Sequence, residues 1–114
     1  MQNKHAKAYI KFLSNVANDT TQFPILDPSE ERMLNHLGTT WHRGKNLTVS
    51  EAIHALPSLS PSTSHKRLKM LRKKDLIDLE VDQIDNRIKY IVHTDLTDKY
   101  FSHLGQCLAK CCDG

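Results

Sequence analysis

A run of basic side chains is the feature of this sequence most able to engage a charged partner. Six Lys or Arg fall within the ten residues from His65 to Lys74, directly after a stretch of small hydroxyl residues. No Asp or Glu lies within residues 52–74, whereas seven of the 13 acids lie within residues 75–98. A basic face beside an acidic one favours an oriented contact with a polyanion, because the summed charge steers such partners. The alternative is a helix surface that is simply solvated.

This basic run is predicted to lie on one helix. Ser60 is the predicted N-cap and Pro61 the first helical residue, a common start signal. Ser64, Leu68 and Leu71 follow three and four residues apart, so they share one face, which we expect to be buried. The opposite side then carries the polar residues Ser62, Thr63, Lys66, Lys69 and Lys73.

Cysteine and histidine near the C-terminus offer a second kind of chemistry. All three cysteines lie in the last eight residues, and His103, Cys107 and Cys111 are spaced by four on one helical stripe, with Cys112 adjacent. Such a stripe could bind Zn²⁺ or act as a thiol sensor. The favoured interpretation is structural, because cysteine packs as a small hydrophobe and no CxxC is present. We therefore predict no bound metal and no cofactor. The candidate ligands of the alternative metal site are His103, Cys107 and Cys111.

The sequence contains no motif or segment that indicates catalysis, secretion or membrane insertion. The seven histidines are scattered, and the motifs HExxH, GxxxxGK and GxGxxG are absent. No apolar run approaches the roughly 20 residues that span a bilayer. The first 17 residues contain Lys7 and Lys11 where a signal peptide needs a continuous apolar stretch. The 114 residues and 25% charged composition fit one folded domain, so a single-domain cytoplasmic protein without enzymatic activity is predicted.

Helices are predicted on the N-terminal side of the basic run. Apolar residues recur at helical spacing over residues 3–17. A second helix begins with Asp27 as N-cap, Pro28 and Glu30, and runs to Trp41. Thr48 and Glu51 frame a third, short helix that Pro57 ends. Two short helices joined by a tight turn, the second of them basic, match the helix-turn-helix pattern.

After Leu76 the apolar period changes from helical to alternating. Residues 76–93 read as a β-hairpin whose turn is "DQIDN", and residues 95–112 form a closing amphipathic helix. The predicted fold class is mainly α (α+β): a winged helix-turn-helix with a two-stranded β-wing and flanking N- and C-terminal helices. The core covers residues 26–94. Residues 1–20 and 95–112 carry the apolar stripes expected to form a dimer interface.

Several segments of this sequence resemble the MarR family of transcriptional regulators. The segments are "LDPSEERMLNHL", "LTVSEAIHALPSLSPSTSHKRLKMLRKKDLI" and, most specifically, the wing signature in "DQIDNRIKYIVHTD", met by Asp85, Arg87 and Thr94. The resemblance covers about residues 26–98. It implies a homodimer that binds double-stranded DNA and leaves room for a small-molecule effector of unknown identity.

The proposed DNA contacts divide by position. The first two turns of the recognition helix, residues 60–74, should reach the major groove, whereas later cations meet phosphates. Arg87 at the wing tip is predicted to enter the minor groove, supported by Asp85. The structural alternatives are solvated charges on the helix and a pair that only holds the wing turn. The groove candidates on the helix are Ser62, Thr63, His65 and Lys66, and the phosphate candidates are Arg67, Lys69 and Lys73.

Departures from the family pattern concern backbone and packing. Asp75 stands where the family usually has Gly after the recognition helix, so a positive φ there would cost more than with Gly. Ser64 replaces an apolar residue, and the segment after the wing is short for a family that dimerises through long helices. The family commonly has Leu-Thr before its last helix, and this pair can be aligned either with His93 and Thr94 or with Leu96 and Thr97.

Two other functions remain open. The winged helix could serve as a protein-protein interaction module that meets an acidic partner, in which case duplex DNA would not bind at low salt. It could also be a metal- or redox-sensing repressor resembling the ArsR family in its input, which stoichiometric zinc in the purified protein would reveal.

Overall fold

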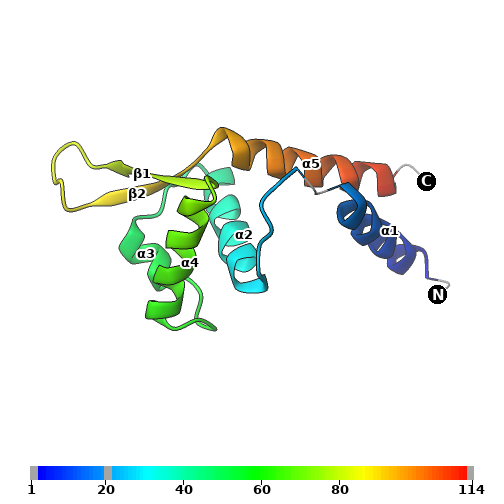
Figure 1. The fold of residues 1–114 in the computed structure, drawn as a ribbon, viewed down its shortest axis with the longest axis horizontal. Helices are drawn as coiled ribbons and strands as arrows, with labels where there is room; N and C mark the ends of the chain where they lie inside the picture. The colour runs from blue at the N-terminus through cyan, green and yellow to red at the C-terminus, as the bar shows by residue number, and fades with distance from the viewer. Residues whose placement is uncertain (1–2, 20–21, 113–114) are drawn as a thin grey trace. The chain divides into compact units, whose positions relative to one another are not determined.

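The computed structural model describes residues 3–19 and 22–112, so part of the predicted segment 1–20 lies outside the described residues. The elements follow the predicted order, and the winged helix-turn-helix class is confirmed (Figure 1). Two compact units are present, Ile25–Thr97 and a second made of Met1–Pro24 with Asp98–Gly114. The elements are α1 (Lys4–Asp19), α2 (Pro28–His42), α3 (Val49–Ile53), α4 (Pro61–Lys73), β1 (Ile77–Val81), β2 (Lys89–His93) and α5 (Asp95–Cys112).

The predicted start signals form the expected caps. The Asp27 carboxylate accepts from the Glu30 amide at 2.8 Å, and the Glu30 carboxylate accepts from the Asp27 amide at 3.1 Å. Thr48 and Glu51 form a second capping box, at the start of α3. The Ser60 hydroxyl accepts from the Thr63 amide at 3.2 Å and begins α4. Each cap satisfies amide groups that a helix leaves without an internal partner.

The wing is an antiparallel hairpin in which Ile77 lies opposite His93 and Val81 opposite Lys89. A third segment also joins it, because the Ile91 amide donates to the Leu47 carbonyl at 2.8 Å. Nothing in the sequence predicted this pairing, since a two-residue segment is too short to show alternation.

The core of unit 25–97 lies between α2, α4 and the wing. The Trp41 Nε1 donates to the Ile91 carbonyl at 3.1 Å and ties the end of α2 to β2. In Figure 1 the helices α2, α3 and α4 lie on one side of the hairpin. This arrangement leaves the outer face of α4 and the wing tip open. The buried apolar side chains of this core are Met33, Leu34, Leu37, Leu47, Ala52, Leu68, Leu71, Leu76, Ile77 and Ile91.

The junction after α4 adopts the strained backbone that the family resemblance implied. Asp75 has φ 63°, and the Leu76 amide reaches back to the Leu71 carbonyl at 3.0 Å, which is the Schellman arrangement. The Thr94 hydroxyl donates to the Asp75 carbonyl at 2.6 Å and accepts from the Thr97 amide at 3.2 Å, so Thr94 caps α5. The Thr97 hydroxyl in turn donates to the Leu76 carbonyl. Both threonines therefore fix the backbone between recognition helix and wing.

The second unit pairs α1 with the later part of α5. The Asn15 side chain donates to the Cys111 sulfur at 3.6 Å, and the Phe23 ring lies 5.5 Å from that of Tyr100. On α1 the apolar side chains of Tyr9, Ile10 and Leu13 are exposed. None of the helices in the described ranges is both long and apolar enough to cross a bilayer.

Replacing Asp75 by Gly should stabilise the protein. Glycine removes the β-carbon penalty of a left-handed residue, offset in part by its larger unfolded-state entropy. We expect the free energy of unfolding to rise by about 0.5–1 kcal/mol in urea titrations. Asp75→Ala is the matched control, because it keeps the β-carbon, and it should give no gain. Equal stability of both variants would contradict the proposed origin of the strain.

Candidate nucleic-acid interface

The helix α4 divides its cations between two faces. Ser64, Leu68 and Leu71 are buried as the sequence predicted, and Arg67 and Lys74 lie over the same side toward α2. Lys66, Lys69 and Lys73 are exposed and form no ion pair within the described part of the chain. An exposed lysine without an internal counter-ion keeps its charge available for an outside partner.

The hydroxyl residues at the start of α4 are partly engaged in the cap. The Ser60 hydroxyl donates to the Thr63 hydroxyl oxygen at 2.9 Å, and the Ser62 hydroxyl lies 3.4 Å from that of Ser60. Ser62 and His65 are exposed, whereas Thr63 is half-buried. The first turn therefore presents donors and acceptors whose positions the cap already restricts.

The wing tip is ordered by two aspartates. The Asp82 carboxylate accepts from the amides of Ile84 and Asp85 at 3.0 and 2.9 Å. The Asp85 carboxylate then holds Arg87 by two parallel bonds of 3.0 Å, from Nε and Nη2. The side chain of Arg87 nevertheless stays 89% exposed. A bidentate pair restricts the guanidinium before any partner binds, so the predicted support of Arg87 by Asp85 has the required geometry.

These bonds also shift the titration of the wing. The bond from the Arg87 side chain, followed by that from its amide, lowers the pKa of Asp85, and the same pair raises the pKa of Arg87. The Asp85 and Ile84 amides lower the pKa of Asp82. The bond donated to Asp82 raises the pKa of Tyr90. Both aspartates are therefore ionised at neutral pH, which keeps the tip ordered.

A groove of about 740 Å³ separates α4 from the wing. Ile53, Leu68 and Ile91 belong to its apolar lining. Arg72 and Lys89 also line this groove, and neither was among the residues predicted to contact DNA. For Lys89, the available signal was its position two residues after Arg87 in a segment of alternating residues. The groove brings five basic side chains to one surface, three of them among the predicted residues: His65, Lys69, Arg72, Arg87 and Lys89.

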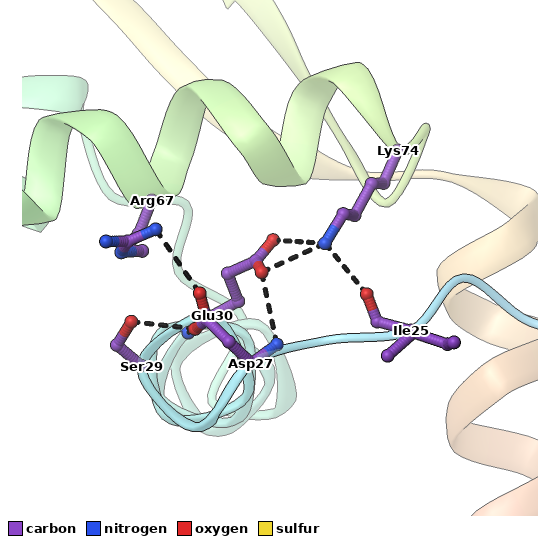
Figure 2. Close-up of polar contacts among 6 residues, drawn as sticks. All are labelled: Ile25, Asp27, Ser29, Glu30, Arg67 and Lys74. Carbon is purple, nitrogen blue, oxygen red and sulfur yellow. Dashed lines mark hydrogen bonds and ion pairs between the residues drawn. The ribbon is translucent and has the colours of Figure 1, made fainter.

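On the opposite side α4 is tied to the first turn of α2 (Figure 2). The Arg67 guanidinium lies 3.3 Å from the Asp27 carboxylate, and the Lys74 ammonium donates to both oxygens of Glu30 at 2.9 and 2.7 Å. Lys74 also donates to the Ile25 carbonyl at 2.8 Å. Arg67 was predicted to contact phosphate; that role stays a prediction, and the contact present in the structure is the one with Asp27.

The predicted metal candidates lie together only as a pair. His103 Nε2 is 3.8 Å from the Cys107 sulfur, while the Cys111 thiol donates to the Cys107 carbonyl at 3.1 Å. The Cys112 side chain lies outside the described residues. Within residues 3–19 and 22–112, no group of three or more His, Cys, Asp or Glu is placed to hold a metal ion.

Solved structures with the same architecture include transcriptional regulators. A mutant of MepR from S. aureus, bound to an oligodeoxyribonucleotide, superposes with a TM-score of 0.67 at 21% identity, over 93% of this chain and 71% of that chain. The heme sensor PefR from Streptococcus agalactiae, in complex with heme, gives 0.62 at 24% identity, over 96% and 76%.

The chain has the winged-helix fold of MarR-type regulators. A probable transcriptional regulator from Pseudomonas aeruginosa shares this fold with a TM-score of 0.60 at 19% identity, over 92% of this chain and 80% of that one. No protein-family model matches the sequence, and no curated protein matches it. The MarR-type resemblance predicted from the wing signature is thus confirmed at the level of the fold.

Removing the Asp82 carboxylate should change the acid sensitivity of the wing. A carboxylate whose folded pKa lies below its ordinary value of 3.8 stabilises the protein above that pH, and the stabilisation is lost as the pH falls through the folded pKa. Asp82→Asn should therefore lower the free energy of unfolding at neutral pH and lose less of it between about pH 5 and about pH 3.

Urea titrations at both pH values make this comparison. Glu80→Gln is the control, because Glu80 is an exposed acid of β1 outside the turn network. If the free energy of unfolding fell equally with pH in the wild type and in Asp82→Asn, the hydrogen bonds to Asp82 would contribute nothing to stability.

Proposed function

We propose that this protein is a transcriptional regulator that binds duplex DNA, with α4 in the major groove and Arg87 at the minor groove. The observation that carries the proposal is the groove between α4 and the wing, where basic side chains converge above an apolar floor. The oligodeoxyribonucleotide bound to the MepR mutant supports it, because that protein has the same fold.

The first turns of α4 are assigned to the bases. A major groove about 12 Å wide admits one helix, and the exposed residues at its start reach the base edges. Lys66 can donate to guanine O6 and N7, while the shorter side chains of Ser62 and His65 can make polar contacts with the base edges. The Thr63 methyl group can touch a thymine methyl, since its hydroxyl is bonded to Ser60.

Phosphate contacts are assigned to the cations farther along. Lys69 and Lys73 are exposed and form no ion pair within the described residues, so neutralising phosphates costs them no existing salt bridge. Arg67 would have to leave Asp27 to do the same, which makes it the weaker candidate. Such contacts supply affinity and register rather than sequence choice.

Arg87 is assigned to the minor groove. A narrow minor groove concentrates negative potential, and a guanidinium inserted there reads groove width. The bidentate bond to Asp85 holds the side chain in one orientation while leaving it exposed, which lowers the ordering cost on binding.

We further propose that the protein acts as a homodimer through α1 and α5. The exposed apolar side chains of Tyr9, Ile10, Leu13 and Leu108 lie in the smaller unit, where a second copy could cover them. Two-fold symmetry would place two α4 helices in successive major grooves and favour a pseudo-palindromic site.

Loss of Lys66, an exposed cation of α4, together with Arg87 of the wing should weaken duplex binding. Fluorescence anisotropy with a mixed-sequence duplex of about 30 base pairs, repeated at several salt concentrations, gives affinity and salt slope; each phosphate contact steepens the slope by about 0.9. Lys66→Ala with Arg87→Ala should lower the affinity at least about tenfold, roughly 1.4 kcal/mol. Arg32→Ala, an exposed cation of α2 outside the groove, should bind as the wild type does.

Two results would reject this proposal. If the wild type failed to bind any duplex at low salt, the protein-interaction module would be favoured. Equal binding by the double variant would exclude Lys66 and Arg87 from the contact. Circular dichroism establishes that each variant is folded.

The dimer is tested by mass. Light scattering at micromolar concentration should give twice the monomer mass of 13.1 kDa. Ile10→Glu and Leu13→Glu together place charges in the exposed apolar stripe and should give the monomer, because burying an unpaired carboxylate is costly. Lys7→Gln and Lys11→Gln, at exposed positions of the same helix, lower the net charge by the same two units and are the charge-matched control. A wild-type monomer would defeat the dimer proposal.

A further inference from the structure

A largely buried ion pair between Glu30 and Lys74 joins α2 to α4. The Glu30 side chain is 4% exposed and that of Lys74 is 22% exposed, so both charged groups are largely excluded from solvent (Figure 2). Lys74 donates to Glu30 Oε1, Glu30 Oε2 and the Ile25 carbonyl, which accounts for the three protons of its ammonium. Lys74 therefore has no donor left for a phosphate, although it belongs to the basic run.

The two partners are themselves fixed by backbone. Glu30 is the third residue of α2 and also accepts from the Asp27 amide at 3.1 Å, so its carboxylate belongs to the capping box. Lys74 is the C-cap of α4, directly before the left-handed Asp75 that Thr94 holds. The pair thus joins the start of α2 to the end of α4 at two positions that cannot easily move.

The apolar contact beneath the pair leaves the position of α4 incompletely defined. Hydrophobic burial is not directional, and the stripe of α4 contains the small residue Ser64, whose buried hydroxyl has no hydrogen-bond partner within the described structure. Charge-assisted bonds are directional. Arg67 and Lys74 lie seven residues apart, two turns along one side of α4, and meet Asp27 and Glu30 of the same turn of α2. Together they set how α4 lies along α2.

We infer that Lys74 and Glu30 are positioning residues for DNA recognition: their ion pair holds α4 at the angle from which its outer face meets the major groove. This inference rests on the proposed function. The inference implies that an acidic side chain, that of Glu30, is required for tight binding to DNA, which is itself a polyanion. Net charge alone predicts the opposite, because Glu30→Gln raises the formal net charge of +3 by one unit and should strengthen attraction to DNA.

The test compares Glu30→Gln with Glu31→Gln. Both variants remove one acid from the first turn of α2, but Glu31 is exposed and outside the ion pair. We expect Glu30→Gln to lower the duplex affinity about tenfold in the folded protein, with the wild-type salt slope, because a broken pair couples the two helices less tightly. Glu31→Gln should bind as tightly as the wild type or slightly more tightly.

A second variant guards against loss of fold. Lys74→Met with Glu30→Gln leaves no unpaired buried charge, so it should remain folded. Its affinity should fall by less than the product of the two single losses, since both substitutions break one interaction, and its salt slope should stay unchanged. Amide chemical shifts recorded without DNA should move along α4 in Glu30→Gln and stay in place in Glu31→Gln.

Three outcomes would overturn the inference. Equal affinity and equal α4 shifts in Glu30→Gln and Glu31→Gln would leave the pair without a positioning role while the proposed function stands. A salt slope reduced by about 0.9 in Lys74→Met, with Glu30→Gln binding normally, would make Lys74 a phosphate contact. No duplex binding by the wild type would reject the proposed function and the inference with it.

Discussion

The contact between α4 and α2 is the constraint on which the rest of the interface depends. Leu68 and Leu71 bury the inner face of α4, and that burial decides which side chains remain outside. A helix turned by one residue would rotate about 100° and bring different cations to the surface. The ion pairs of Arg67 and Lys74 oppose such a rotation, because each one has a single acidic partner at a fixed place on α2. Packing therefore sets which face of α4 is buried, and the two ion pairs restrict how the helix lies along α2.

The wing depends on the same kind of restraint in a different element. Its two strands could slide or twist relative to α4, yet the backbone between them and the helix is held at Asp75 and Leu76 by the hydroxyls of Thr94 and Thr97. At the far end Asp82 and Asp85 fix the turn through amide groups and through Arg87. Acidic and hydroxyl residues therefore position the helix and the wing on which the proposed DNA contact relies. This gives the acid-rich segment that follows the basic helix a structural role.

Much of this architecture was predictable because it depends on local signals. Asp27, Thr48 and Ser60 are caps whose partners lie three residues away, and the alternation around residues 76–93 indicates the hairpin directly. The positive φ of Asp75 was predictable only through the family resemblance. What the sequence could not show was which cations turn inward. Arg67 and Lys74 find their partners 40 and 44 residues away, and no helical period encodes a partner on another helix.

The inward-facing cations limit what a count of charges can mean. The six cations of residues 65–74 act as three groups: Arg67 and Lys74 bind α2, Arg72 lies 3.6 Å from Asp78 of β1, and three lysines remain for an outside partner. Arg67 and Lys74 belong neither to a solvated surface nor to a surface that contacts a polyanion, because acidic side chains of α2 neutralise their charges inside the fold. A basic helix attracts DNA through the cations that packing leaves unpaired, and their number and direction follow from tertiary structure. The acids that neutralise the others are part of the same recognition surface, because they decide where that surface points.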